Sequence, residues 1–266
     1  MATRTTWKSR GVLNGTALRR DSPPGRYLPE PPLDGFVEHF WTVAWNLDAP
    51  IVRETLPHPS VHLIVEAGRS GLTGPFTRRF TRRLEGRGRV LGIKFLPGGF
   101  RPFWKRSISS LANRVLPLGE AFGRAGETFE TDILACGDDE PALLARAEQF
   151  LLARLPPPDA QAQLARSLVA RIRADPTLLR TETLADQAGL SVRALQRLFS
   201  GYVGVSPKWV IQRYRLHEAM ERLESGAARD LPALAQELGY FDQAHFSRAF
   251  KALLGRSPGS YARESK

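Results

Sequence analysis

Two short stretches of the chain carry arginine and glutamine side chains of a kind that can read the edges of nucleic-acid bases. In the first stretch, Arg193, Gln196 and Arg197 recur at intervals of three and four residues, which places them on one face of a helix. An arginine can donate two parallel hydrogen bonds to guanine, and a glutamine can pair in the same way with adenine. The second stretch offers four polar side chains for the same chemistry: Gln243, His245, Ser247 and Arg248.

Alanine occupies two positions in these stretches that could carry longer side chains. These are Ala194 and Ala244. A methyl side chain can make only an apolar contact with a base, such as the contact with the methyl group of thymine. The residues therefore predict two polar helix faces that contact bases, each with one apolar position. They do not define a target sequence.

The elements that must position these side chains occur twice in the sequence. Leu184, Ala185 and Gly189 recur fifty residues later, whereas Phe199 and Pro207 recur after 51 residues. The second copy has thus gained one residue in the turn between its glycine and its second helix. A repeat of this length is typical of one supersecondary unit that is used twice.

Each copy has the pattern of a helix-turn-helix, predicted at about 183–200 and 233–251. A short apolar helix ends at a glycine, which can adopt the left-handed conformation that closes a helix. Ser191 in the first copy and Asp242 in the second are predicted to cap the next helix. A long helix from about Pro207 to Ser225, apolar on more than one face, joins the two units.

The first half of the chain has a different pattern, rich in glycine, proline and aromatic residues. Three short apolar runs are bounded by turn residues and predict strands at 36–45, 60–68 and 89–96. A single helix is expected at Glu140–Arg154. The fold class predicted is α+β, with a cupin-like sandwich or barrel before an all-α domain. The predicted boundaries are a mainly-β domain at 1–155, a proline-rich linker at 156–160 and the helical domain at 161–266.

The net charge of +11 favours polyanions as partners. The charge is uneven, because residues 69–114 carry twelve basic side chains and one acidic one, whereas residues 120–148 carry eight acidic and two basic ones. We expect the arginines of the run FTRRFTRR to pair with this acidic stretch, in the same or a neighbouring subunit, rather than with phosphates: Arg78, Arg79, Arg82 and Arg83. No run is long and apolar enough to span a membrane, and the first fifteen residues lack a signal-peptide core, which predicts a cytoplasmic location and no membrane partner.

Other chemistry finds less support in the sequence. Cys136 is the only cysteine, which excludes an internal disulfide and a zinc site built from several thiolates. Four possible metal ligands follow one another at steps of four residues, but two prolines interrupt the strand that would carry them: Glu54, His58, His62 and Glu66. The glycine-rich turn at 96–100 lacks the Lys-Ser/Thr pair of a phosphate-binding loop. We therefore predict no metal, no cofactor and no catalytic residue.

The repeated helical segments resemble the AraC/XylS family of transcriptional regulators. The resemblance is carried by LADQAGLSVRALQRLFSGYVGVSPKWV and LAQELGYFDQAHFSRAFKALLGRSPGSY, which together span about a hundred residues. The seven polar residues named above match the positions that this family uses for DNA contact. The segments ETLPHPSVHLIVEAG and GIKFLPGGFRPFW look like an effector domain of an uncharacterised subset of the same family.

This resemblance implies a regulator that binds double-stranded promoter DNA and works with RNA polymerase. Its two recognition helices are expected to enter successive major grooves, about 34 Å apart. A small-molecule effector and a homodimer are further partners that the resemblance suggests. Two alternatives remain open for the first domain: a cupin-type metal-dependent enzyme fused to a DNA-binding module, and a ligand-free domain that serves only for association.

Overall fold

The structure is a computed structural model that describes residues 3–4, 25–228 and 230–264. These residues form two compact units. Unit 1 contains the residues up to Arg166 together with Ser200–Gly204, and unit 2 contains the remainder.

The sequence predicts no signal peptide at the start of the chain and no membrane-spanning helix. The first fifteen residues, expected to lack a signal peptide, lie outside the described residues except for Thr3 and Arg4. Among the described helices, none has both the length and the apolar character needed to cross a membrane.

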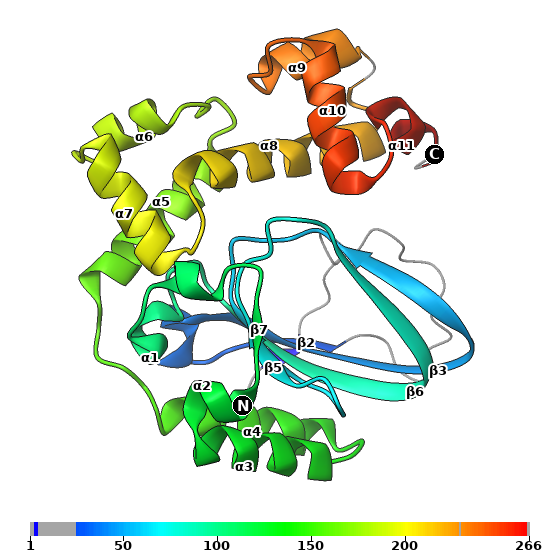
Figure 1. The fold of residues 1–266 in the computed structure, drawn as a ribbon, viewed down its shortest axis with the longest axis vertical. Coiled ribbons are helices and arrows are strands. Elements are labelled where there is room, and N and C mark those ends of the chain that lie inside the picture. Colours follow the sequence, from blue (N-terminus) through cyan, green and yellow to red (C-terminus); the bar gives the residue numbers. More distant parts are fainter. Residues whose placement is uncertain (1–2, 5–24, 229, 265–266) are drawn as a thin grey trace. The chain divides into compact units, whose positions relative to one another are not determined.

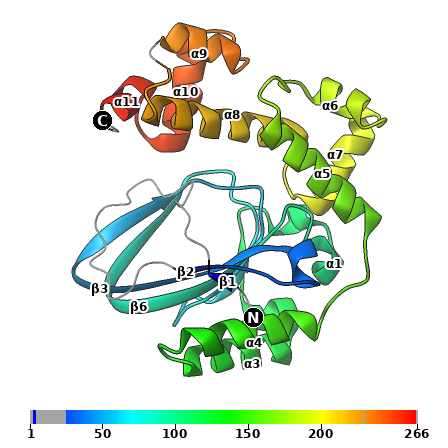
Figure 2. The same ribbon diagram turned by 180° about the vertical axis from the view of Figure 1, so that it is seen from behind.

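Unit 1 is built on one seven-stranded antiparallel sheet (Figures 1 and 2). Along the chain its strands are β1 (Thr3–Arg4), β2 (Gly25–Leu28), β3 (Val37–Thr55), β4 (His62–Val65), β5 (Gly71–Thr73), β6 (Phe80–Phe95) and β7 (Val115–Leu116). Their order in the sheet is β1-β2-β3-β6-β4-β5-β7. The mainly-β prediction is confirmed, since the three apolar runs lie in β3, β4 and β6. Both β3 and β6 continue well beyond those runs, because polar residues extend their pairing to Thr55 and Phe80.

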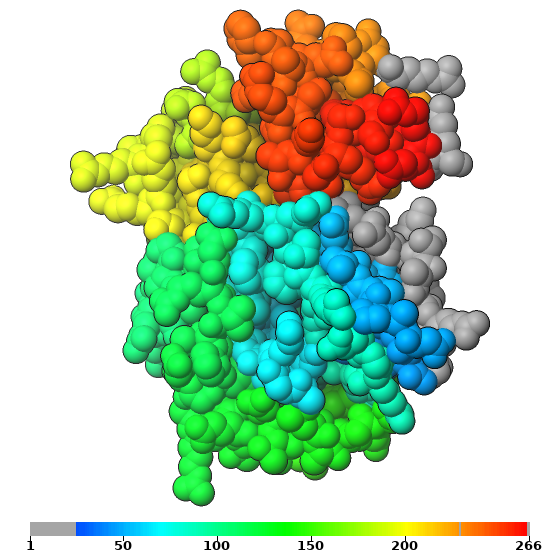
Figure 3. Space-filling view, turned by 45° about the vertical axis from the view of Figure 1, so that its right-hand side comes forward, coloured from blue at the N-terminus to red at the C-terminus, as the bar shows by residue number. Residues whose placement is uncertain are grey.

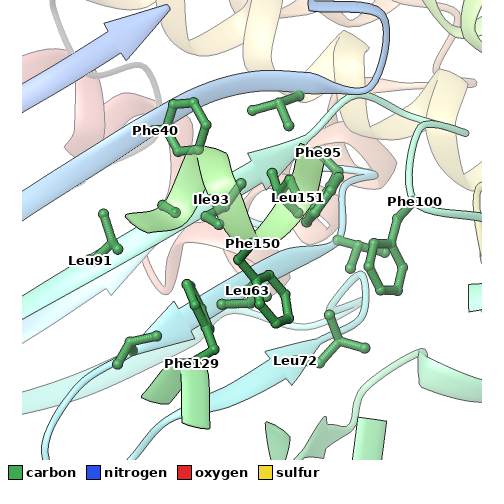
Figure 4. Close-up of a cluster of buried hydrophobic side chains, with 14 of the residues drawn as sticks. Phe40, Leu63, Leu72, Leu91, Ile93, Phe95, Phe100, Phe129, Phe150 and Leu151 are labelled. Carbon is green, nitrogen blue, oxygen red and sulfur yellow. The ribbon is translucent and has the colours of Figure 1, made fainter. Parts of the chain in front are cut away.

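Helices cover one face of this sheet and complete the main core of unit 1. The helices are η1 (Leu33–Gly35), α1 (Arg101–Trp104), η2 (Ile108–Leu111), α2 (Leu118–Phe122), α3 (Arg124–Ala135) and α4 (Glu140–Leu152). Phe129 of α3 and Phe150 of α4 stack with ring centroids 4.1 Å apart and pack over Leu63 and Ile93 of the sheet (Figure 4). The helix expected at Glu140–Arg154 is present as α4, whereas α2 and α3 were not predicted.

The opposite face of the sheet carries a second, smaller apolar cluster. Trp45, Leu84 and Val90 are buried there, and Trp41 packs against them. The ring of Trp41 lies on Gly92 and that of Trp45 on Gly88, so closely that a Cβ atom at either glycine would collide with the indole. These strand glycines are therefore positions of close ring approach.

Within the chain, three of the four FTRRFTRR arginines pair with carboxylates outside the acidic stretch, so the expected pairing inside one subunit is wrong for them, and pairing with a neighbouring subunit stays a prediction. Arg79 pairs with Glu54 at 3.2 Å, Arg82 pairs with Glu66, and Arg83 pairs with Glu85 at 3.2 Å. Glu54 and Glu85 belong to β3 and β6, whose antiparallel register places Glu54 opposite Thr81, and Glu66 directly follows β4. The acidic stretch is reached by later arginines instead: Arg87 and Arg89 pair with Asp138 at 3.0 and 3.5 Å.

Unit 2 is all-helical, as predicted. Its helices are α5 (Ala160–Ala174), α6 (Thr181–Gln187), α7 (Val192–Tyr202), α8 (Pro207–Glu224), α9 (Leu231–Glu237), α10 (Gln243–Leu254) and α11 (Pro258–Glu264). The helix expected between the two repeats is present as α8. Figure 3 shows α10 and α11, in orange and red, packed side by side at the surface. The first residues of α5 and the last of α7 are grouped with unit 1, and the predicted linker at 156–160 remains a prediction.

Candidate nucleic-acid interface

The first helix-turn-helix consists of α6, a tight turn and α7. Gly189 adopts a left-handed φ of 63°, and the Leu190 N–H donates to the Ala185 carbonyl at 3.0 Å, which closes α6. The Ser191 hydroxyl accepts a hydrogen bond from the Ala194 N–H at 3.2 Å and caps α7. The glycine and the cap predicted from the sequence are both confirmed.

The second helix-turn-helix repeats this construction with α9 and α10. Gly239 has a φ of 77°, and the Tyr240 N–H donates to the Ala235 carbonyl at 2.9 Å. The Asp242 carboxylate accepts from the His245 N–H at 2.6 Å and caps α10, as predicted. The same two hydrogen bonds thus define both turns.

Each second helix buries one face and leaves the other to solvent. The buried side chains are Leu195, Leu198 and Phe199 of α7 and Phe246, Phe250, Leu253 and Leu254 of α10. Six of the seven predicted site residues are exposed: Arg193, Gln196, Arg197, Gln243, His245 and Arg248. Ser247 is half-buried, and the His245 ring packs edge-on against Tyr240 at 5.3 Å.

The exposed faces of α7 and α10 are both basic. Neither helix contains an aspartate or a glutamate. Arg193 and Arg197 supply the charge of α7, and Arg248 and Lys251 supply that of α10. Lys251 was not among the predicted site residues, although it lies on the same face as Ala244 and Arg248 at helical spacing. Two acid-free helices with exposed arginines suit a polyanion that presents hydrogen-bonding edges.

Comparisons with known proteins agree with this geometry. Residues 184–264 match a family described as a helix-turn-helix domain, and residues 25–117 match a domain of unknown function (DUF6597). Over 149 residues the chain is 32% identical to the HTH-type transcriptional regulator GlxA of Rhizobium meliloti (strain 1021), covering 56% of this chain and 37% of that protein. Over 78 residues it is 37% identical to a Streptomyces lividans protein described as an AraC-like transcription regulator, covering 29% and 25%. The helical domain is of the AraC type.

The matches cover only part of each of these relatives. The chain spans less than half of the length of each of them. Among solved structures, the C-terminal domain of AraT, a response regulator from Geobacillus stearothermophilus, is 29% identical with a TM-score of 0.33, covering 36% of this chain and 84% of that one. The match of residues 25–117 to a domain of unknown function agrees with the uncharacterised effector-type domain expected from the sequence.

A buried arginine of α8 joins this helix to the end of α5 in the AraC-type domain. Arg215 is 2% exposed, and its guanidinium donates to the carbonyls of Ile172 at 2.6 Å and Asp175 at 2.8 Å, at the end of α5. Carbonyls in the last turn of a helix have no partner within that helix, and Arg215 supplies a donor to both, in addition to the hydrogen bond of 3.3 Å that the Asp175 carbonyl accepts from the Leu178 N–H. It also pairs with Glu218 at 2.5 Å.

The ion pairs continue from Glu218 towards the second helix-turn-helix. Glu218 also pairs with Arg222 at 2.6 Å, and Arg222 pairs with Glu237 of α9 at 2.5 Å. One chain of charged groups therefore runs from the end of α5, along α8, to α9. Sequence reasoning missed it because it considered only the apolar residues of this helix, although the spacing of Arg215, Glu218 and Arg222 was a usable signal.

A second buried arginine lies where α8 meets the turn of the second unit. Arg213 lies over the Trp209 ring at 4.5 Å. Burial lowers the pKa of Arg213 to about 10, and the proximity of Tyr240 opposes this shift. Burial also raises the pKa of Tyr240 to about 12, so that this phenol is neutral at physiological pH.

Three of the four residues considered as metal ligands in unit 1 have other partners or surroundings. Glu54 and Glu66 pair with Arg79 and Arg82. His62 lies in β4 opposite Lys94, and burial together with this lysine lowers the pKa of the imidazole to about 3. Within the described ranges of the chain, no three side chains of histidine, cysteine, aspartate or glutamate come together as a metal site.

Proposed function

We propose that this chain is a sequence-specific DNA-binding transcriptional regulator. The observation that carries the proposal is the pair of acid-free recognition helices, α7 and α10, that present exposed arginines from two helix-turn-helix units of the AraC type. The residues proposed to contact DNA are Arg193, Gln196, Arg197, Gln243, His245, Ser247 and Arg248. An N-terminal segment of a recognition helix reads base edges in the major groove, whereas basic residues further along it neutralise phosphates.

For unit 1 we propose a role in sensing a small-molecule effector. A ligand alters DNA binding only if it has different affinities for the DNA-competent and DNA-incompetent states. The partly buried side chains of Trp41, Val43 and Leu47 around the smaller apolar cluster supply apolar surface of the kind that such a ligand needs. Homodimerisation through this unit, and contact of the DNA-bound regulator with RNA polymerase, are part of the same proposal.

The DNA-binding function is expected to reside in residues 160–266 alone. This fragment contains all of unit 2, including the buried aromatic side chains of both helix-turn-helix units, Phe199, Phe246 and Phe250. We expect its circular dichroism spectrum to be mainly helical. In footprinting, it should protect the same duplex that the full chain selects from a randomised pool. A fragment that is unfolded, or that is helical but leaves this duplex unprotected, would contradict an autonomous reading domain.

The alternative that unit 1 is a metal-dependent enzyme is tested by metal analysis. Because Arg79 and Arg82 occupy the two carboxylates of the candidate ligand set, we expect the purified full chain to contain no stoichiometric iron, manganese or zinc. Mass spectrometry of the protein after dialysis against metal-free buffer measures this content. One bound metal ion per chain, lost on substitution of His62, would favour the enzyme.

A further inference from the structure

One aromatic side chain of the second helix-turn-helix is almost completely exposed to solvent. Phe241 is 93% exposed, whereas the other exposed large apolar side chains of the described residues range from 37% to 55%. Single exposed apolar residues are common on protein surfaces, so exposure alone assigns no role to Phe241. Its position in the repeat gives the second observation.

Phe241 is the extra residue of the second turn. In the first unit, Leu190 alone separates Gly189 from the cap. Tyr240 takes the place of Leu190 in the second unit, because its N–H makes the corresponding hydrogen bond to the end of the preceding helix. The Tyr240 ring packs on Phe246 at 5.3 Å and thus belongs to the core. Phe241 is therefore the added residue, and its ring lies outside that core.

The surroundings of Phe241 favour a nucleic acid over a protein as its partner. The residue precedes the cap of α10, at the end of the helix that reads base edges in helix-turn-helix proteins. The adjacent carboxylate of Asp242 is committed to the cap, and α10 itself is basic and acid-free. Ala244 stands where the first unit has Arg193, so the first turn of α10 offers a methyl group instead of a guanidinium.

We propose that Phe241 contacts the methyl group of a thymine in the major groove, with Ala244 as a second apolar contact. This inference rests on the proposed DNA-binding function. Phenylalanine and alanine are among the side chains that recognise thymine by its methyl group. The two recognition helices then read DNA by different chemistry: α7 through arginine and glutamine hydrogen bonds, and α10 through an apolar contact beside Arg248.

The test removes the methyl group from the DNA and the ring from the protein. The full chain selects a duplex from a randomised pool, and each thymine is then replaced in turn by 2′-deoxyuridine, which lacks only this methyl. We expect one replacement to weaken binding of the wild-type chain about 3- to 5-fold. Phe241→Ala should weaken binding of the unmodified duplex about 5- to 20-fold and should abolish the effect of that replacement.

Leu134→Ala is the matched control, since Leu134 is an exposed apolar residue of α3. It should change neither the affinity nor the response to deoxyuridine. Phe241→Ala that binds like the wild-type chain, or that keeps the full deoxyuridine effect, overturns the inference and leaves Phe241 to a protein partner. Arg248→Ala distinguishes failure of this inference from failure of the proposed function. If Arg248→Ala and Phe241→Ala both bind like the wild-type chain, the proposed function is wrong. If only Arg248→Ala loses affinity, only the proposed contact of Phe241 is wrong.

Discussion

Replacing Arg248 or Arg193 by alanine is expected to raise the dissociation constant for the selected duplex about 5- to 150-fold. This range corresponds to the loss of about 1–3 kcal/mol when a guanidinium paired with a base edge is removed. Both side chains are exposed on the free faces of α10 and α7, so the free energy of unfolding should remain unchanged. Footprinting titrations with each variant measure the affinity, and urea denaturation measures the stability.

Arg173→Ala provides the control for the loss of one positive charge. Arg173 is an exposed residue of α5, outside both recognition helices. We expect it to reduce affinity for the selected duplex and for unrelated duplexes equally, and by less than either test variant. If all three variants bound alike, the residues of α7 and α10 would act only as general counter-charges, and the model of base readout would be wrong.

Arg215→Met is expected to lower the free energy of unfolding of the helical domain by about 3 kcal/mol. The change removes the guanidinium that donates to the carbonyls of Ile172 and Asp175, and it removes the buried partner of Glu218. Unsatisfied buried polar groups and a broken buried ion pair are among the most destabilising results of a single substitution. In the fragment 160–266, Trp209 is the only tryptophan, so its fluorescence during urea denaturation follows this domain directly.

Arg222→Met tests whether burial is the cause of this effect. Arg222 occupies the same helix and shares Glu218, but its side chain is partly exposed. Exposed ion pairs contribute little to stability, so we expect a loss of no more than about 1 kcal/mol. Equal losses for the two arginines would show that the whole chain of ion pairs, rather than the cap on α5, supports the domain.

The sequence predicted the helical domain well because its determinants are local and repeated. The closing glycines, the caps Ser191 and Asp242 and the buried stripe of each second helix depend on residues within a few positions of one another. The repeat strengthened each prediction, because a glycine or cap that occurs at the same place in both copies is rarely a coincidence. Ser247 shows the limit of this reasoning: it was assigned to the free face of α10, yet it lies at the boundary of that face and is half-buried.

The features that the sequence missed depend on contacts between distant segments. Arg213 and Arg215 are buried because α8 is covered from several sides. The apolar residues on more than one face of α8 indicated this cover, but they did not show that two arginines would lie beneath it. The partners of the FTRRFTRR arginines follow from the register of β3 with β6, and net charge per segment carries no information on register. Helix α3 was missed because only Gly126, Phe129 and Ile133 of its residues are buried, among many polar ones.

The continuous helix α8 has a consequence for how binding sites of this protein can change over generations. Each residue of a helix advances the chain by about 1.5 Å and turns it by about 100°. A single insertion in α8 would therefore rotate one recognition helix away from the groove at every promoter at once. Under the proposed function, the distance between the two halves of a binding site is thus shared by all target sites, and it is more constrained than the bases within each half.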